Sequence, residues 1–585
     1  MKFLLVAVNA KYIHTNPAIY SLRGYLPEDL QSCVTLREYT INQETDEILE
    51  DMASQKPTHI GFSCYLWNIE KIRQMLPELL KILPGTEIWL GGPEITGNYR
   101  NPVYRLPGIT GLIYGEGEAI FADLVKSCAA LCGIRPQSEY VPPESISGIV
   151  MNGELRRGAR EPVAMDDLPF LYEKPEDFAN KILYYESQRG CPYSCSYCMS
   201  ANEKKLRFKS LAKVEKELQL FLDAKVPQVK FTDRTFNCNE KHALGVWKYL
   251  LEHDNGVSNF HFEVAAECMT EAEIALLGKM RPGLVQLEMG VQTTNPKTLA
   301  VISRTSDFAN VSYVAQKIRE GRNIHLHLDL IAGLPLEDYE SFGRSFNDVY
   351  GLRPNQLQLG FLKVLHGTPM EKDAPKYGII YHDTPPYEVL STDVLSYEEV
   401  RRLKKIENMV EIYYNSGQFT ATIQALAGEF PTPFAMYEAM ADYYEKNGLF
   451  VNTPARVHRY EVLLDFIRSL PKDPKKAKER DAFYRETLVY DMYLRENLRT
   501  RPSFATEQAP FKDILKKAKT EVPKSHVEPF FYRVWEETDG SEYPKAGVSP
   551  KVKEACPVFL KFDYENRDPL SYNARVSVWT PESGE

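Results

Sequence analysis

The chain has 585 residues and a net charge of −10, with 43% hydrophobic and 26% charged residues. This length predicts two to four domains, and the acidic balance excludes a protein that binds polyanions by bulk charge. The apolar run at residues 3–8 is too short to cross a membrane and polar residues soon follow it, so we expect neither a signal peptide nor a membrane anchor. Ten cysteines, three of them in one motif, favour a reducing cytoplasmic environment over a disulfide framework.

Residues 1–132 alternate short apolar runs with helical segments. The pattern predicts strands and helices in turn, with strands at 3–8, 34–39, 59–63, 87–90 and 111–114 and helices at 17–25, 44–54, 69–82 and 119–129. Strands that alternate with helices in this way form a parallel sheet covered on both faces. We therefore expect a ligand, if the domain binds one, at the carboxyl ends of the strands.

The loops after four of these strands are rich in small and polar residues. Glycine lets a backbone approach a bulky ligand closely, although a Gly-Gly pair after a strand is more often a plain turn. The candidate ligand-binding residues of these loops are Asn9, Ser63, Gly91, Gly92, Glu94, Gly115, Glu116 and Gly117.

Residues 133–180 contain several prolines and mixed charge, which indicates a linker. Asn152-Gly153 predicts a hairpin between residues 146–150 and 154–156.

Three cysteines, Cys191, Cys195 and Cys198, follow with the spacing C-x3-C-x2-C, and Tyr197 directly precedes the last one. Three thiolates can hold three irons of a [4Fe-4S] cluster and leave the fourth iron open to a substrate. Structural zinc wants a fourth nitrogen or sulfur ligand, and no such residue lies nearby in the sequence. Zinc or three unrelated thiols remain the alternatives.

This motif resembles the signature of the radical S-adenosylmethionine (SAM) superfamily. The segment 181–385 carries six strand candidates with helices between them, at 182–187, 228–232, 261–265, 284–290, 325–331 and 356–364. Six βα units predict a partial (β/α)6 TIM barrel, which is the fold that the resemblance implies. In such barrels the chemistry gathers at the carboxyl ends of the strands.

The resemblance also implies residues that contact SAM. They are Tyr197 and Met199 beside the last cysteine, Glu288 and Gln292 on one strand, Asp329 and Gly333 on the next, and Asp233. Asp329 replaces the usual first glycine of its motif and Glu337 comes one residue late, which leaves the adenine contact open. Asp233 has the alternative role of a structural carboxylate in the barrel.

A five-stranded domain before such a cluster motif resembles the cobalamin-binding domain of B12-dependent radical SAM enzymes. The resemblance implies a corrinoid over the strand ends, with its nucleotide tail near Ser63 and the Gly91-Gly92 pair. The cobalt-ligating motif D-x-H-x-x-G of many B12 domains is missing from the first loop, residues 9–17. We expect His14 of that loop to be a surface residue or an outer partner rather than a cobalt ligand.

From residue 386 to 585 the pattern turns to helices, predicted at 398–416, 433–447, 457–468, 483–498 and 512–519. This part resembles the uncharacterised C-terminal domain of one branch of the same proteins. Residues 452–524 hold 17 Lys and Arg against 11 Asp and Glu. Such a surface suits RNA phosphates, but a solvated helix face explains it as well.

The resemblance implies an enzyme that uses a [4Fe-4S] cluster, SAM and cobalamin, together with an electron donor such as flavodoxin or ferredoxin. A 5′-deoxyadenosyl radical would take hydrogen from an unactivated carbon, and that carbon would then receive a methyl group. A methylthio transfer to tRNA is a variant, although the remaining cysteines form no second triplet.

Two other functions stay open. One is a B12-associated radical SAM enzyme that closes rings or rearranges carbon skeletons without methyl transfer. The other is a corrinoid-binding sensor or carrier with a structural cluster, which would form no deoxyadenosine. The sequence does not decide between RNA, a peptide and a small metabolite as substrate.

Overall fold

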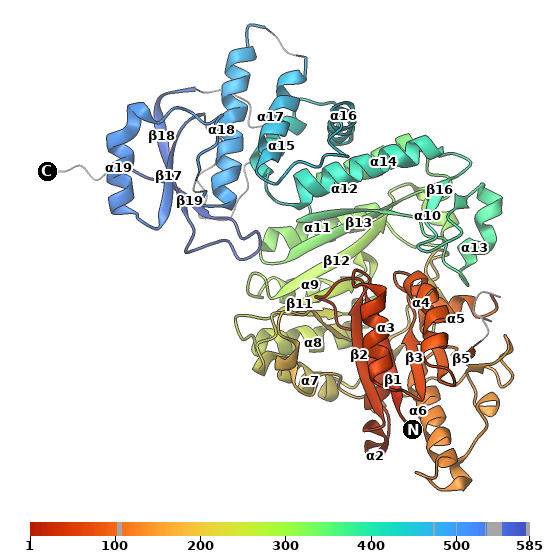
Figure 1. Ribbon diagram of the computed structural model, residues 1–585. Helices are drawn as coiled ribbons and strands as arrows, with labels where there is room; N and C mark the ends of the chain where they lie inside the picture. The colour runs from red at the N-terminus through yellow and green to blue at the C-terminus, as the bar shows by residue number, and fades with distance from the viewer. Residues whose placement is uncertain (102–107, 472–473, 499, 533, 535–552, 581–585) are drawn as a thin grey trace.

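The computed structural model describes residues 1–101, 108–471, 474–498, 500–532, 534 and 553–580. Figure 1 shows three parts, in which the N-terminal sheet (red to orange) lies against the central barrel strands and the C-terminal helices (cyan to blue) lie on the opposite side of the barrel. No helix among the described residues is both long and apolar enough to cross a membrane. The predicted mixed α/β organisation is confirmed.

The N-terminal part is a six-stranded sheet in the order β2-β1-β3-β4-β5-β6, in which only β6 is antiparallel to its neighbour. Its strands are β1 (Phe3–Asn9), β2 (Val34–Thr40), β3 (His59–Ser63), β4 (Glu87–Gly91), β5 (Ile109–Ile113) and β6 (Ile149–Val150). All seven residues of β1 are buried, as expected for a central parallel strand with helices on both faces. The helices are α1 (Pro17–Gly24), α2 (Glu28–Gln31), α3 (Thr45–Ser54), α4 (Ile69–Ile82), α5 (Pro93–Asn98) and α6 (Gly117–Leu131).

The hairpin predicted in the linker is only partly present. Its first half, β6, pairs with β5 of the sheet, and around Asn152-Gly153 a single bridge joins Met151 to Glu154. The turn forms as predicted, with both turn residues in the left-handed region. The first predicted strand, however, pairs with β5 at the edge of the parallel sheet.

The central part is a second parallel sheet of six strands in the order β14-β13-β12-β11-β10-β7, which confirms the predicted partial barrel. The strands are β7 (Leu183–Tyr185), β10 (Gln228–Phe231), β11 (Asn259–Val264), β12 (Val285–Gln292), β13 (His325–Ala332) and β14 (Gln356–Phe361). Helices between them are α7 (Leu211–Asp223), α8 (Glu240–Glu252), α9 (Glu271–Leu277), α10 (Pro296–Val301), α11 (Phe308–Gly321) and α12 (Tyr339–Gly351). A short pair, β8 (Gln188–Arg189) and β9 (Arg207–Phe208), brackets the cysteine loop.

The barrel strands have one apolar face and one polar face. In β12 burial alternates strictly, so that Val285, Leu287, Met289 and Val291 are buried and the residues between them are only partly buried. Because side chains alternate along a strand, the apolar set packs under the helices and the polar set lines the barrel interior. The sequence of these strands therefore builds a polar chamber inside the barrel.

The C-terminal part packs on the β14 edge of the barrel. Beyond the connecting elements α13 (Pro369–Asp373), β15 (Ile380–Tyr381) and β16 (Val389–Ser391), it contains α14 (Tyr397–Val410), a π-helical turn at Glu411–Asn415, α15 (Thr420–Ala427), α16 (Pro433–Lys446), α17 (His458–Ser469), α18 (Ala477–Arg495) and α19 (Lys512–Glu521). It also holds an antiparallel sheet of β17 (Ser525–Tyr532), β18 (Lys553–Asp563) and β19 (Arg575–Val578), which the sequence analysis does not predict. Four aromatic residues of the helices and this sheet, Tyr490, Tyr493, Phe530 and Phe562, pack against one another in edge-on and tilted arrangements.

A buried carboxylate holds two helices of this part together. Asp491 of α18 is 1% exposed and accepts hydrogen bonds from the backbone nitrogens of Ala421 and Thr422 at the start of α15, both at 2.9 Å.

We predict that Asp491→Ala lowers the free energy of unfolding by about 2–4 kcal/mol, because two buried N–H groups lose their acceptor. Asp465→Ala on α17, whose side chain is 60% exposed, serves as the control and should change it by less than about 0.5 kcal/mol. Urea unfolding followed by circular dichroism measures both, and equal values for the two variants would contradict this account.

Candidate functional site

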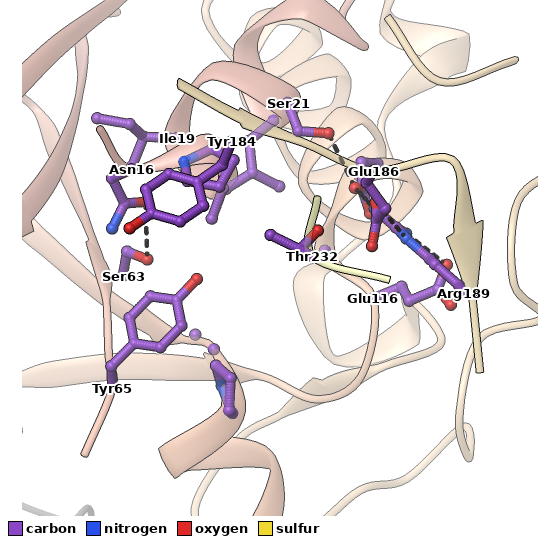
Figure 2. A pocket seen from close by; sticks show the side chains of 18 of the residues that line it. Asn16, Ile19, Ser21, Ser63, Tyr65, Glu116, Tyr184, Glu186, Arg189 and Thr232 are labelled. Carbon is purple, nitrogen blue, oxygen red and sulfur yellow. Dashed lines mark hydrogen bonds and ion pairs between the residues drawn. The ribbon is translucent and has the colours of Figure 1, made fainter. Parts of the chain in front are cut away.

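A cavity of about 990 Å³ lies where the N-terminal sheet meets the barrel. Figure 2 shows Tyr65 and Tyr184 on one side of it and Glu116 and Arg189 on the other, with Thr232 between them. The strand-end loops of the first sheet, the ends of β10 and β11 and the residues around the cysteine loop all contribute to its lining. Its volume is at the upper end of the range for small-molecule sites, so it can enclose a large ligand.

Most of the candidate residues of the N-terminal loops line this cavity, as predicted for the carboxyl ends of a parallel sheet. They are Asn9, Ser63, Gly91, Gly92, Gly115, Glu116 and Gly117. Gly115 has φ +87° and open space where a Cβ would project, whereas at Gly92 (φ +114°) a Cβ would lie 2.5 Å from the carbonyl oxygen of Cys64. Both positions require glycine, the first to leave room at the cavity wall and the second to let β3 and β4 approach.

Glu94, the remaining candidate of these loops, is not part of the cavity lining. It is 8% exposed and accepts a hydrogen bond from the hydroxyl of Tyr387 at 2.6 Å. The structure thus corrects this assignment, since Glu94 ties the N-terminal sheet to the connection that follows β14.

Aromatic residues supply the flat surfaces of the cavity. Tyr65 and Trp67 stack with ring centroids 4.4 Å apart and planes 12° from parallel. His14 hydrogen-bonds through Nδ1 to the hydroxyl of Tyr184 on β7 at 2.7 Å. Burial lowers the pKa of His14.

The cysteine loop is held in one conformation by its backbone. Gly190 has φ +91°, and a Cβ there would lie 2.7 Å from the carbonyl oxygen of Lys205, so only glycine fits before Cys191. The amide of Cys191 donates to the carbonyl of Glu203 at 3.1 Å, and the amide of Ser196 donates to that of Ile302 at 2.9 Å. All ten cysteines are free thiols, and Cys191 and Cys195 are buried.

Arg304, which the sequence analysis missed, lies beside this loop. Its Nη1 donates to Sγ of Cys195 at 3.7 Å, and its Nη2 donates to the carbonyl oxygen of Gly290 on β12. Burial raises the pKa of the Cys195 thiol, and the guanidinium works against that shift. A fixed cation at this distance stabilises a thiolate, which is the form of cysteine that binds metals.

Gln292, one of the candidate SAM contacts, ends β12 at a bulge next to Arg304. Its backbone has φ +71°, and its side-chain nitrogen lies 2.2 Å from where a Cβ on Gly290 would be. Oε1 of Gln292 and Nε of Arg304 are buried, and neither has a hydrogen-bond partner within the described part of the chain. One unmatched acceptor and one unmatched donor beside the cysteines fit a polar ligand that carries both kinds of group.

Asp233 takes its alternative role as a structural carboxylate. It is fully buried and accepts hydrogen bonds from the amide of Ser187 at 2.8 Å, from the Ser187 hydroxyl at 2.5 Å and from the amide of Gln188 at 3.0 Å. Its oxygens brace the turn that leads from β7 to the cysteine loop, so it is not available to a ligand.

Glu288 and Asp329 lie inside the barrel rather than beside the cysteines. Glu288 is four residues before Gln292, which is about 13 Å along a strand, and it contacts Lys230 and His261 at 3.2 and 3.0 Å. Asp329 lies 3.1 Å from His327. These contacts hold the two carboxylates in the barrel interior.

Of the three remaining candidates, one lines the cavity and two pack against neighbouring residues. Met199 lines the cavity, whereas Tyr197 packs among the apolar residues around Ile302 and Leu334. Gly333 has φ +84°, and a Cβ there would lie 2.6 Å from Val389 of β16. Its role in the structure is to let this connection pack closely.

Ion pairs join the cysteine loop to the N-terminal sheet. Arg189, two residues before Cys191, binds Glu116, Glu118 and Glu186 at 2.8, 2.7 and 2.9 Å, and its side chain is only 13% exposed. Arg207 of the neighbouring strand β9 also binds Glu116. Although burial raises the pKa of Glu118, Arg189 holds it below its ordinary value. The loop that carries Gly115 and the loop that carries the cysteines are thus one connected unit.

Comparison with protein families divides the chain into three parts. Residues 4–125 match the B12 binding domain, residues 185–349 match the Radical SAM superfamily, and residues 375–538 match a protein family of unknown function (DUF4080).

One curated relative matches about half of the chain. The cobalamin-dependent radical SAM methyltransferase TokK of Streptomyces tokunonensis is 24% identical over 318 residues, which are 49% of this chain and 44% of TokK. The chain therefore spans less than half the length of this curated relative.

Two solved structures share the fold. The cobalamin-dependent SAM radical enzyme OxsB, with aqua-cobalamin and SAM bound, aligns with a TM-score of 0.54 at 15% identity, over 88% of this chain and 84% of OxsB. The radical SAM methyltransferase TsrM of Kitasatospora setae, with cobalamin and a [4Fe-4S] cluster bound, aligns with 0.53 at 17% identity, over 66% of this chain and 79% of TsrM. The expected arrangement of the two α/β parts is thereby confirmed.

We predict that Arg189→Gln lowers the free energy of unfolding by about 3 kcal/mol or more, because three carboxylates that share one buried cation lose it. Lys248→Gln is the control, since Lys248 and its partner Glu252 are 67% and 55% exposed and such pairs contribute about 0.5 kcal/mol. Urea unfolding checks the difference. A loss for Arg189→Gln no larger than for the control would show that the network does not join the two parts.

Proposed function

We propose that the chain is a cobalamin-dependent methyltransferase that acts on an unactivated carbon, because its two α/β parts match the B12 binding domain and the Radical SAM superfamily. The observation that carries the proposal is the shared cavity. Its lining comes from the strand-end loops of the B12-binding domain, from the neighbourhood of the cysteine loop and from the barrel strands. An enzyme that brings a corrinoid, SAM and a substrate together needs a cavity that all three binding regions line.

The cysteine loop fits an iron–sulfur cluster. Cys191, Cys195 and Cys198 are the proposed ligands, and the backbone hydrogen bonds of the loop fix them before any metal binds. Three ligands leave one iron open, as the SAM chemistry requires. Beside them, the buried Oε1 of Gln292 and Nε of Arg304 are the polar atoms that we assign to SAM.

The N-terminal loops fit a corrinoid. Gly115 leaves open space at the cavity wall, and the stacked pair of Tyr65 and Trp67 offers an apolar surface. The first loop, residues 9–17, lacks the motif D-x-H-x-x-G, so we assign no protein nitrogen to the cobalt. The nucleotide tail is assigned to the loops at Ser63 and Gly91-Gly92.

When bound, the cluster supplies the electron that cleaves SAM, and cobalamin supplies the methyl carrier. The residues of the chain position these groups, enclose them and exclude water. Arg189 links the corrinoid loop to the cluster loop, and the barrel interior is the chamber in which a substrate carbon would be presented.

Methyl transfer is favoured over methylthio transfer by the likeness to methyltransferases.

A tRNA substrate has little support, because several basic residues of the C-terminal part are ion-paired. Arg456, Arg468, Arg480 and Arg501 bind Glu496, Asp481, Glu429 and Glu528. These pairs use the charges of the four arginines within the C-terminal part, and the substrate class stays open.

We predict that the anaerobically reconstituted protein, given SAM, a strong reductant and hydroxocobalamin, forms both 5′-deoxyadenosine and S-adenosylhomocysteine. Cys195→Ala should lose at least 100-fold in deoxyadenosine formation, whereas the exposed Cys132→Ser should keep it. Liquid chromatography with mass spectrometry measures both products. Deoxyadenosine without S-adenosylhomocysteine would favour the cyclase or rearrangement reaction, and neither product with corrinoid bound would favour the sensor or carrier.

We predict that Gly115→Val lowers cobalamin occupancy more than tenfold and leaves the iron content unchanged, because the new side chain enters the open space at the cavity wall. Gly133→Val is a matched control, since Gly133 also has a positive φ (+73°) and open space around it but does not line the cavity. Bound corrinoid is measured by absorbance after gel filtration. Equal occupancy in the two variants would place the corrinoid elsewhere.

A further inference from the structure

The barrel interior contains a group of histidines and carboxylates that the proposed function does not use. It consists of Lys230 on β10, His261 on β11, Glu288 on β12, and His327 and Asp329 on β13. Strand register pairs Lys230 with His261 and Glu288 with His327, so the side chains come from adjacent positions on four parallel strands. Both histidines are 6% exposed.

His327 and Asp329 are in close contact in the barrel interior. Nε2 of His327 lies 3.1 Å from Oδ1 of Asp329, yet neither atom has an aligned hydrogen-bond partner in the described ranges. Two ligands that each lie about 2.1 Å from a common ion, at angles of 90–109°, are about 3.0–3.4 Å apart. The spacing of these two atoms is therefore that of two ligands of one ion.

We propose that Glu288, His327 and Asp329 bind a divalent metal ion of the Mn²⁺ or Fe²⁺ class. One ligand atom of each residue lies within 4.8 Å of the other two. An imidazole nitrogen with two carboxylate oxygens is a mixed set that suits these ions, whereas soft thiolates would favour zinc or an iron–sulfur cluster.

The surroundings of Glu288 fit the role of a ligand. Nζ of Lys230 and Nε2 of His261 lie 3.2 and 3.0 Å from its Oε2, and we assign the ion to Oε1. Metal-binding carboxylates are commonly oriented by such outer partners. Within the described residues, no lysine or arginine nitrogen lies within 4 Å of Asp329, so a metal ion would supply the positive charge that this buried carboxylate lacks.

The site is open on one side. The side chains of Glu288 and Asp329 are 20% and 17% exposed, whereas that of His327 is 7% exposed. Lys230, which contacts Glu288, also lines the cavity. With three protein ligands, the ion keeps free positions for an oxygen of a substrate, such as a carboxylate, hydroxyl or amide oxygen. This anchoring role rests on the proposed function, whereas the binding of the ion does not.

Mn²⁺ binding to the reconstituted holoprotein tests the proposal. With the cluster as [4Fe-4S]²⁺ and the cobalt as Co(III), both cofactors are EPR-silent, and the free Mn²⁺ signal reports binding directly. We expect one Mn²⁺ per chain for the wild type and for His325→Gln, a matched control on the same strand and face. Glu288→Gln and Asp329→Asn should bind at least tenfold more weakly.

A second measurement keeps the test decisive if a variant fails to fold. Electron spin echo modulation of Mn²⁺ bound to the wild-type protein should show the nitrogen coupling of one histidine. No stoichiometric Mn²⁺, no nitrogen coupling, or equal binding by Asp329→Asn and the wild type would overturn the proposal. Loss of methyl transfer alone would not, because the EPR readout requires no turnover.

Discussion

The buried ion-pair network around Arg189 is the interaction on which the arrangement of the site depends. Arg189 precedes the cysteine loop by a single glycine. Its partners Glu116 and Glu118 belong to the loop and helix that follow β5 of the N-terminal sheet. A guanidinium suits this position because it offers several donors in a fixed geometry and stays charged when buried. One side chain thus connects the loop that carries Gly115 and Glu116 to the cysteine loop, beside the cavity.

The same network explains why the two parts are expected to act together. A buried cation shared by three carboxylates is costly to break, so the domains cannot separate without leaving charges unpaired. Tyr387 with Glu94 and His14 with Tyr184 add polar contacts across the same boundary. These contacts hold the two walls of the cavity together.

The fold was largely predictable because its signals are local. The apolar run of β1, the alternation in β12 and the glycines after β4 and β5 each follow from period and turn chemistry within a few residues. The cysteine motif was equally local. The antiparallel sheet of β17, β18 and β19 escaped prediction because its two longer strands contain proline, Pro529 in β17 and Pro557 in β18, which argues against a strand in the sequence.

Two assignments at the site changed for one physical reason. Asp233 and Glu94 lie near strand ends, but sequence position does not reveal whether another buried group will hydrogen-bond to a carboxylate. The Ser187 hydroxyl donates to Asp233, and the Tyr387 hydroxyl donates to Glu94. Glu288 is likewise in contact with His261 and Lys230. Arg304 was missed for the converse reason, since nothing near residue 304 in the sequence shows that the chain returns to Cys195.

The central claim is that one cavity lies between a corrinoid and an iron–sulfur cluster. Anomalous diffraction from anaerobic crystals of the reconstituted protein, recorded at the cobalt and iron edges, tests it most directly. The account predicts a cobalt peak inside the cavity between Gly115 and Thr232 and a separate iron peak at Cys191, Cys195 and Cys198. A cobalt peak outside the cavity, or iron bound away from these cysteines, would contradict it.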